Sequence, residues 1–345
     1  MAAELAPVPG TSQRPPHTPD RTGTSAASWL PTARRRLVLL GGTALVVIGG
    51  FLTLGVSGNW AFVLERRAMT LATMVVVAVA IAVSTVVFHT LTTNHILTPG
   101  VMGFDSLYIL VQTVAVLVWG TTWTTALGDV PRFGLETLLL LGFALPVMRW
   151  VFVTRRHSIE LVVLVGIVAG GLFRAGSGFL QRIMDPTQFI VLQDSFFADF
   201  NSASPPLLAT CAVVVGAITI VVWSDRHTLD VLSLGRESAT ALGVNHRRVM
   251  MRHLVLVTVL VSASTVLVGP STFFGLLVVH VGYRIVRTHR HVVTLPAAAI
   301  TGVVCLVGGQ LLFERVLGFE GSLSMIVEFL GGLTFIALFL RRARA

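Results

Sequence analysis

Residues 68–89 read AMTLATMVVVAVAIAVSTVVFH, a stretch of twenty-two residues with no charged side chain apart from a terminal histidine that can be protonated. As a helix this stretch would be about 33 Å long, slightly more than the roughly 30 Å hydrocarbon core of a bilayer. An α-helix satisfies its backbone N–H and C=O groups within the segment, as the bilayer core requires. The stretch therefore predicts a transmembrane helix.

Similar apolar runs recur along the whole chain. Of the 345 residues, 54% are hydrophobic and 12% are charged, and the mean hydropathy is +0.83. Soluble domains are usually about half apolar and a quarter charged, and could not bury this much apolar surface. We predict an all-α polytopic membrane protein of about ten transmembrane helices. The runs lie near 37–56, 68–89, 103–120, 134–152, 160–179, 205–223, 252–268, 272–286, 294–313 and 323–340.

The distribution of arginine predicts the orientation. The net charge of +9 would suggest a nucleic-acid partner in a soluble protein, but here the arginines cluster in short segments between apolar runs, so we expect no nucleic acid. If the N-terminus is cytoplasmic, most arginines lie on the cytoplasmic side, as the positive-inside rule requires, and both termini are cytoplasmic. The exceptions are Arg66, Arg67, Arg132, Arg174, Arg182 and Arg315.

The N-terminal residues differ from the rest of the chain. Residues 1–33 are rich in Pro, Ser, Thr and Ala and predict a disordered cytoplasmic tail, followed by a transmembrane domain over 34–345. Arg34 to Arg36 and the apolar run from Leu37 resemble a signal peptide. The run continues to about Val56, however, which is too long for a signal sequence, and it predicts the first membrane helix.

The sequence lacks the residues that several kinds of functional site require. The sequence contains no lysine, which excludes a P-loop, so any ATP hydrolysis must come from another chain. Cys211 and Cys305 lie within apolar runs and predict packing positions rather than a disulfide or a metal site. We find no pair of carboxylates, Ser-His-Asp spacing or Cys/His pattern at membrane depth, and we expect neither a cofactor nor a metal. These features predict a conduit rather than an enzyme.

Two connections are longer than the topology requires, and long loops often carry function. The outer one, about 180–204, holds three aspartates and four phenylalanines, and we expect it to form short helices at the membrane surface. The inner one, about 224–251, contains DVLSLGRESATALGVNHRRVMMRHL from Asp230 to Leu254. It predicts a short helix, a break at Gly235 and a second small helix before Gly243.

This inner loop resembles the cytoplasmic coupling loop of FecCD-type permeases, the iron-chelate and cobalamin importers of the ABC superfamily. Further stretches agree in the same order. His95 and Val279 stand where the family commonly has Pro. Through such departures the chain resembles the branch that serves anguibactin- and petrobactin-type ferric siderophores. The stretches are TNHILTPGVMG from Thr93 to Gly103, GPSTFFGL from Gly269 to Leu276, His280 through Arg284, VLQDSFFADFN from Val191 to Asn201, and EGSLSMIVEFLGG from Glu320 to Gly332.

The resemblance implies a type II ABC importer permease fold in a bacterial cytoplasmic membrane. Its function would be ATP-driven import of ferric siderophores, with cobalamin or haem as alternative cargo. An ion-coupled secondary transporter is a weaker alternative, because its candidate acids are few: Asp105, Glu136, Glu160 and Glu328. The implied partners are cytoplasmic ABC ATPase subunits, a second permease subunit that favours a heterodimer, an extracytoplasmic siderophore-binding protein and membrane lipid.

The resemblance also implies roles for particular residues. The coupling loop, about 229–248, would seat its small residues in a cleft of the ATPase. The contact residues would be Leu234, Gly235, Glu237, Ala241, Leu242 and Gly243. Asn94, His95 and Ile96 would form part of a cytoplasmic gate; alternatively, Asn94 caps the next helix and His95 is a solvated loop residue. His280 lies in an apolar run, where we expect hydrogen-bonded packing rather than metal binding.

The remaining sites concern the outer side and the path. Arg66, Arg67 and Arg315 would pair with glutamates of the binding protein, although Arg66 could instead pair with Glu65 or reach lipid headgroups. The resemblance places the fifth and tenth helices beside the path. Arg174 on the fifth would then attract an anionic chelate, with Glu328 on the tenth; alternatively, Arg174 reaches the interface or pairs with Glu328.

Overall fold

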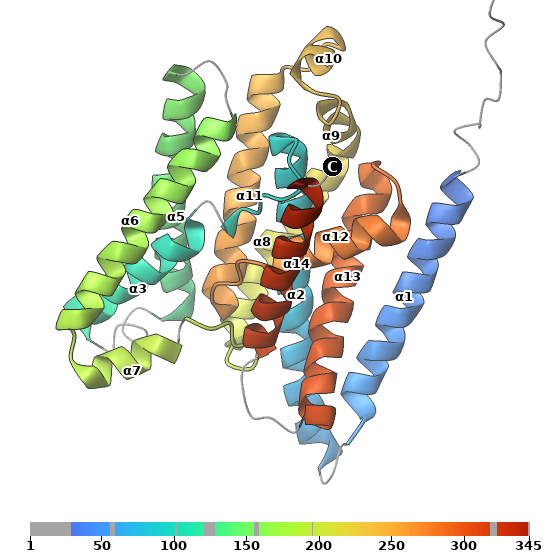
Figure 1. Cartoon of the computed structure of the whole chain (residues 1–345). Coiled ribbons are helices and arrows are strands. Elements are labelled where there is room, and N and C mark those ends of the chain that lie inside the picture. The colour runs from blue at the N-terminus through green and yellow to red at the C-terminus, as the bar shows by residue number, and fades with distance from the viewer. Residues whose placement is uncertain are drawn as a thin grey trace, which may run out of the picture.

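The computed structural model describes residues 29–55, 59–100, 103–120, 128–154, 159–194, 196–317 and 323–343. Every regular element within these ranges is a helix (Figure 1), which confirms the all-α prediction. Most of the predicted tail, residues 1–28, lies outside the described residues. So do Val101 and Met102 of the loop after residue 92, and 320–322 of the predicted closing segment.

Ten longer helices follow the ten predicted runs in order. They are α1 Trp29–Thr53, α2 Trp60–Thr92, α3 Phe104–Trp119, α5 Asp129–Thr154, α6 Ile159–Ile183, α8 Pro205–Ser224, α11 His246–Val268, α12 Phe274–Val286, α13 His291–Leu312 and α14 Leu323–Ala343. Shorter elements are α7 Pro186–Asp194, α9 Arg226–Leu232, α10 Arg236–Ala241 and the π-helix η2 Phe313–Leu317, which continues α13. The helix α7 confirms a short helix in the outer loop.

Four predicted helix starts were five or more residues late. The observed starts are Trp29 of α1, Trp60 of α2, Asp129 of α5 and His246 of α11, where the runs began near 37, 68, 134 and 252. At α11 the reason is a cap, because the Asn245 side chain accepts a hydrogen bond from the backbone N–H of Arg248 at 3.1 Å. A basic first turn is compatible with helix even though it interrupts the apolar pattern.

The distribution of polarity is that of a membrane protein. Within the described residues, α1, α2, α6, α8, α11 and α13 contain stretches long and apolar enough to cross a membrane. Apolar side chains such as Val46 and Leu172 are 75% and 69% exposed, whereas Thr73 and Thr258 are fully buried. Lipid solvates the apolar surface and the interior satisfies the hydroxyls, so this pattern fits a bilayer. The number of crossings, about ten, stays a prediction.

The helix α2 forms the centre of the fold. It packs against α11, α13, α8 and α12, and its residues from Ala80 to Thr92 are continuously buried. Small residues allow these close contacts: a Cβ at Gly302 of α13 would lie only 3.2 Å from the Ala78 side chain. Close approach of backbones through small residues is how helices associate in lipid.

Two segments between the α-helices pass through the middle of the fold. The described residues between α2 and α3 are 93–100 and Gly103, and residues 269–273 join α11 to α12. Both segments line one small cavity together with Ile81 of α2, which lies eleven residues, or about 16 Å, before the end of that helix. Irregular backbone at membrane depth is tolerated only inside protein or beside a cavity, so this place is a candidate functional site.

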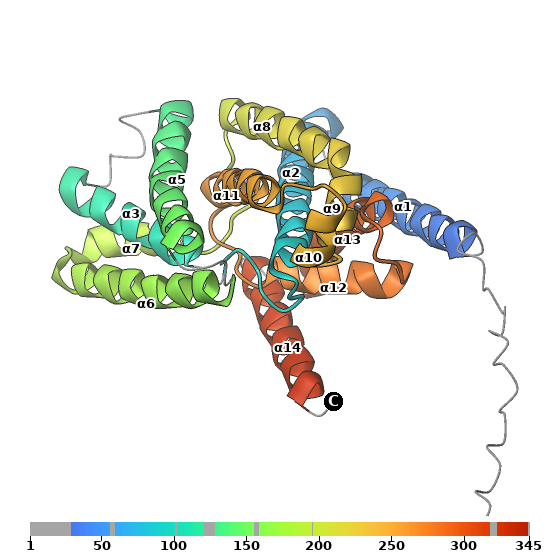
Figure 2. The same cartoon turned by 90° about the horizontal axis from the view of Figure 1, so that it is seen from above.

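The ends and sides of the molecule differ. The helices α9 and α10 lie at one end and α7 at the opposite end (Figure 1). Viewed from above, α6, α12 and α14 lie along the same side, and the C-terminal part of α14 extends away from the other helices (Figure 2).

Candidate functional site

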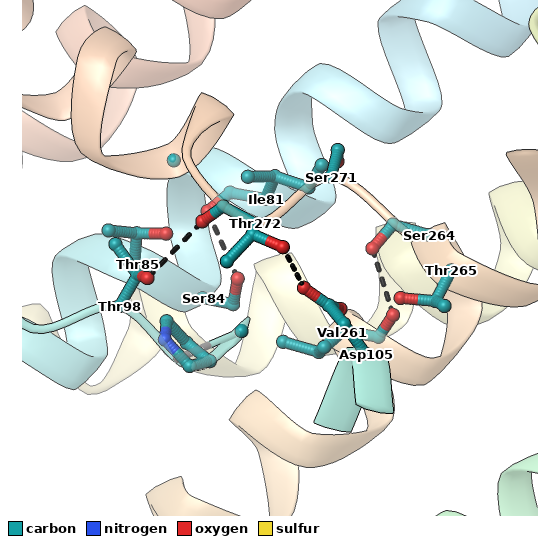
Figure 3. Close-up of a pocket in the computed structure, with 13 residues that line it drawn as sticks. Ile81, Ser84, Thr85, Thr98, Asp105, Val261, Ser264, Thr265, Ser271 and Thr272 are labelled. Carbon is teal, nitrogen blue, oxygen red and sulfur yellow. Dashed lines mark hydrogen bonds between the residues drawn. The ribbon is translucent and has the colours of Figure 1, made fainter. Parts of the chain in front are cut away.

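The two predicted motif loops meet at Asp105, the second residue of α3 (Figure 3). The Thr272 hydroxyl donates to Asp105 Oδ2 at 2.6 Å, and the Thr98 hydroxyl donates to the Thr272 carbonyl at 3.3 Å. A Cβ at Gly100 would lie 2.8 Å from Asp105 Oδ2, so a larger residue there would displace the Asp105 carboxylate. The cavity between the loops measures about 20 Å³, enough for about one water molecule.

A second carboxylate reaches the same loop. Glu328 of α14 lies near the backbone of Thr272 and interacts electrostatically with Asp105. This proximity of Asp105 and Glu328 was not noted in the sequence. The two acids are far apart in the sequence, and only the loop 269–273 brings them to one threonine.

Arg174 of α6 supplies the positive charge of this site. Its Nη2 donates to the Ser106 hydroxyl at 3.4 Å, and the guanidinium interacts electrostatically with Asp105. Arg174 is exposed and makes no ion pair with Glu328, although both side chains are described. The site thus combines two carboxylates and one guanidinium from α3, α14 and α6.

The predicted gate residue His95 is exposed, as the alternative of a solvated loop residue expects, and it also contacts neighbouring rings. Its ring meets the rings of His89 and Tyr283 edge-on, each with centroids 5.5 Å apart, and His280 lies 5.8 Å from His89. We call His89, His95, His280 and Tyr283 the ring cluster. It joins the loop after α2 to α2 itself and to α12.

Hydrogen bonds within this region differ between the rings. His280 Nδ1 donates to the Leu276 carbonyl at 2.9 Å, as expected for hydrogen-bonded packing. Neither ring nitrogen of the buried His89 has a hydrogen-bond partner within 3.5 Å, although the main chain of Leu97 lies near the ring. The Asn94 side chain accepts from the Ile96 N–H at 3.0 Å. Asn94 therefore stabilises a turn within the loop, and the alternative that it caps the next helix was wrong.

Metal coordination has no candidate in the part of the chain that the structure describes. No group of three or more His, Cys, Asp or Glu side chains within the described ranges has the geometry to hold a metal ion. The ring cluster is thus a packing arrangement of imidazoles and a phenol.

The three arginines predicted for docking divide into two kinds. Arg67 Nη1 donates to the carbonyls of Phe51 and Leu54 at 2.7 and 2.8 Å. Arg315 Nη2 donates to the carbonyls of Leu54 and Gly55 at 3.0 and 3.2 Å. Both guanidinium groups therefore hold the end of α1. Arg66 is exposed and makes no hydrogen bond or ion pair to the described residues.

The predicted coupling segment has the expected form. Gly235 separates α9 from α10 with φ of 92°, and Gly243 ends α10 with φ of 82°, both values that favour glycine. Leu234 and Leu242 are 62% and 63% exposed. Of the other predicted contact residues, Glu237, Ala241 and Gly243 are exposed and Gly235 is half-buried. The segment presents two leucines among small residues on the surface.

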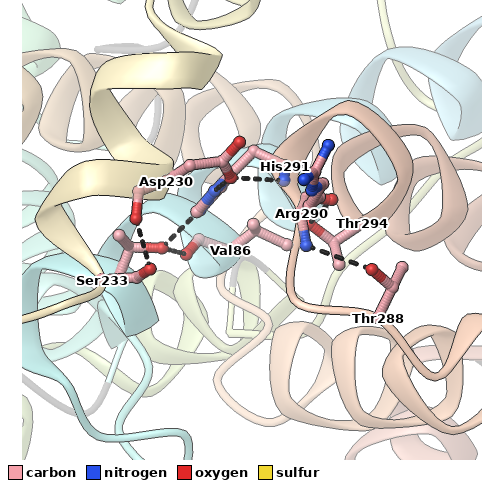
Figure 4. A network of polar contacts seen from close by, with 8 residues as sticks. Val86, Asp230, Ser233, Thr288, Arg290, His291 and Thr294 are labelled. Atoms are coloured by element: carbon pink, nitrogen blue, oxygen red, sulfur yellow. Dashed lines mark hydrogen bonds and ion pairs between the residues drawn. The ribbon is translucent and has the colours of Figure 1, made fainter. Parts of the chain in front are cut away.

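One polar network was missed in the sequence. His291, the first residue of α13, contacts Asp230 of α9 and Thr90 of α2 (Figure 4). The signal was weak, because a histidine at a helix start and an aspartate sixty residues earlier match no motif. Asp105 was noted only as a candidate acid, although its place two residues after Gly103 could have marked it.

Comparison with known proteins gives a consistent result. A model described as the FecCD transport family matches residues 38–341. The chain is 38% identical over 310 residues to the petrobactin import system permease protein YclO of Bacillus subtilis (strain 168), covering 90% of this chain and 98% of that protein. It is 31% identical over 280 residues to the petrobactin import system permease protein FatC of Bacillus anthracis, covering 81% and 79%.

A solved structure shows the same fold. An inward-facing conformation of a metal-chelate type ABC transporter superposes with a TM-score of 0.76 at 20% identity, covering 89% of this chain and 99% of that chain. At this identity the likeness concerns the arrangement of the helices.

Proposed function

The chain belongs to the FecCD transport family, and from this we propose that it is the permease subunit of an ABC importer that carries ferric siderophores across the bacterial cytoplasmic membrane. The fold is that of a type II ABC importer permease. The observation that carries the proposal is the 38% identity to a petrobactin permease over 98% of that protein's length. The family resemblance expected from the motifs is confirmed.

The proposed partners follow from the surfaces described above. A cytoplasmic ABC ATPase would receive the exposed Leu234 and Leu242 beside α10, where small residues permit a close fit. ATP must be hydrolysed by such a partner, because the chain has no lysine for a P-loop. A second, different permease would complete the path, and both termini would be cytoplasmic.

We also propose the order of sites along the path. Arg66 would dock an extracytoplasmic siderophore-binding protein, because its guanidinium is free of contacts to the described residues, whereas Arg67 and Arg315 hold α1. Arg174 would attract the anionic chelate beside Asp105 and Glu328. The segment Asn94 to Ile96, held by the ring cluster, would close the path on the cytoplasmic side.

Uptake of radio-iron tests this proposal. Cells lacking the chain are compared with cells in which it is restored, using ferric petrobactin, ferric anguibactin and unrelated ferric siderophores, each with and without depletion of ATP. We expect ATP-dependent uptake of at least one chelate to require the chain. Affinity purification of the tagged chain from the same cells is expected to recover an ABC ATPase and a second permease.

Other outcomes separate the alternatives. If uptake of labelled cobalamin or haem, and not of iron chelates, depends on the chain, the permease assignment holds and the cargo is wrong. If no uptake depends on ATP and no ATPase is recovered, an ion-coupled mechanism using Asp105 and Glu328 replaces the proposal.

A further inference from the structure

A chain of strong hydrogen bonds connects the coupling loop to two central helices. The Asp230 carboxylate accepts from the backbone N–H of His291 at 2.8 Å and from His291 Nδ1 at 2.6 Å. His291 Nε2 lies 2.7 Å from the Thr90 hydroxyl. His291 is 3% exposed and Thr90 8%, so their contact is shielded from water, whereas the Asp230 side chain is 27% exposed. The chain runs from α9 through α13 to α2.

Asp230 also acts as the missing cap of α13. The residue before this helix, Arg290, provides no side-chain cap, and the first backbone N–H of the helix is satisfied by Asp230 from another element. A carboxylate at a helix N-terminus is favoured by the helix dipole as well as by the bond. The double contact to one residue therefore links α9 firmly to the start of α13.

The donors and acceptors are consistent in either protonation state of His291. The carboxylate can only accept, so Nδ1 carries a hydrogen. If the ring is neutral, the Thr90 hydroxyl donates to Nε2. If the ring is charged, Nε2 donates to Thr90, whose hydroxyl then donates to the Val86 carbonyl at 3.0 Å. The chain of contacts is unbroken in both cases.

The connection continues to the loop proposed as the gate. Thr90 follows His89 in α2, and the His89 ring contacts the His95 ring with centroids 5.5 Å apart. Residues from the network and from the ring cluster line one cavity of about 340 Å³: Thr90, His291, His89, His95 and Tyr283. Ser233 and Leu234 of the coupling loop also line it. A displacement of α9 thus reaches the gate through His291, Thr90 and the contact between the rings of His89 and His95.

We propose that Asp230, His291 and Thr90 are positioning residues that transmit movement of the coupling loop to the gate segment Asn94 to Ile96. This rests on the proposed function, in which an ATPase moves α9 and α10. An ordinary surface loop would gain little from two contacts of one carboxylate to a buried helix start. A coupling element, in contrast, requires a rigid connection on both sides, so that a movement of α9 displaces α13 and α2.

Coupling between ATP hydrolysis and transport provides the first test. In the assembled importer in nanodiscs and proteoliposomes, Asp230→Asn and the near-isosteric Thr90→Val are expected to leave hydrolysis within about twofold while chelate transported per ATP falls roughly tenfold, the size of one lost charge-assisted bond. Because the residues act in series, the double variant should be no worse than the poorer single variant. The proposal would be overturned if the loss of transport per ATP in the double variant were the product of the two single losses. An equal fall in hydrolysis and transport would also overturn it.

The matched control is Asp225→Asn. Asp225 begins the same loop but pairs with Arg252 at 3.1 Å and His253 at 3.4 Å, both in α11. It is an acid of the same connection that does not reach α13 or α2 through these contacts. We expect the ratio of transport to hydrolysis to stay unchanged in this variant; an equal loss of coupling would show that any disturbance of the loop has the same effect.

A second test does not depend on the cargo. Ile96→Cys, with Cys211 and Cys305 replaced by alanine, reports the gate segment through its rate of maleimide labelling in the assembled complex. ATP is expected to change this rate at least threefold, and Asp230→Asn to abolish the change while Asp225→Asn keeps it. A change that persists in Asp230→Asn refutes the relay. If the unaltered importer transports no cargo with ATP, the proposed function fails, yet the labelling still decides about the relay.

Discussion

At the residue scale, two arginines donate hydrogen bonds to backbone carbonyls at the C-terminal end of the first helix. The last carbonyls of a helix have no partner within it, and a cation near them is favoured by the dipole. Arg67 comes from the first turns of α2 and Arg315 from η2, and both donate to Leu54. The Arg67 guanidinium also lies 5.7 Å from the centre of the buried Phe51 ring. The positive charges predicted for the outer side thus have a structural reason that the positive-inside rule does not include.

The substitution Arg67→Ala is expected to reduce stability. Two bonds to carbonyls and the ring contact are lost at a partly exposed site, so we expect a loss of about 1–2 kcal/mol. A lower melting temperature of the chain in nanodiscs measures the effect. The adjacent Arg66→Ala is the control, because this exposed side chain makes no hydrogen bond or ion pair to the described residues, and its melting temperature should not change. Equal melting temperatures of both variants would contradict the structural role of Arg67.

At the element scale, α3 and α6 touch through glycines. Gly103 precedes α3 with φ of 90°, and a Cβ there would lie 2.8 Å from the Cα of Gly170. Close packing here places Asp105 and Ser106 against α6, within reach of Arg174. A small-residue contact therefore sets the position of the charged site.

We expect Gly170→Ala to separate these helices. A Cβ at this position would lie 2.9 Å from the Gly103 backbone, which cannot move as a side-chain tip would, so the cost is about 1–3 kcal/mol. The melting temperature and the uptake rate should both fall. The neighbouring Gly171→Ala, where a Cβ would meet nothing within 4 Å, is the matched control and should keep both. An unchanged melting temperature of Gly170→Ala would show that α3 and α6 can move apart without a loss of stability.

At the scale of the whole molecule, the charged site lies between elements that one chain leaves partly open. Arg174 is exposed and Glu328 half-buried, on helices α6 and α14 that lie along the same side of the molecule (Figure 2). On α14, Phe329 and Leu333 are 71% and 55% exposed. A second permease packed on this side would enclose the charges and make the path.

In that assembly the substitution Arg174→Ala is expected to weaken uptake of an anionic chelate. Removing the only cation of the described charge group leaves two carboxylates that repel the cargo, so we expect the apparent KM for uptake to rise about five- to tenfold with little change in maximal rate. Arg182→Ala, an exposed arginine in the last turn of the same helix, is the control. Equal kinetics of Arg174→Ala and the unaltered chain would remove Arg174 from the path.

Local patterns in the sequence were sufficient for the elements of this protein. Apolar runs such as 68–89 predict helices because a bilayer demands local satisfaction of the backbone, and glycines such as Gly235 predict breaks because they adopt positive φ. The central part of α2, the order of the ten longer helices and the form of the coupling loop followed from these rules. The starts of α2 and α11 did not, because charged residues near each start hide the helix from a hydropathy pattern.

The site itself was decided by tertiary structure. The motif loops around Thr98 and Thr272 could be read separately, but the sequence contains no sign that both meet at Asp105, or that Glu328 joins them. The same holds for Asp230, His291 and Thr90. Hydropathy and turn preferences depend on neighbours along the chain, whereas hydrogen bonds between distant residues depend on how the helices pack.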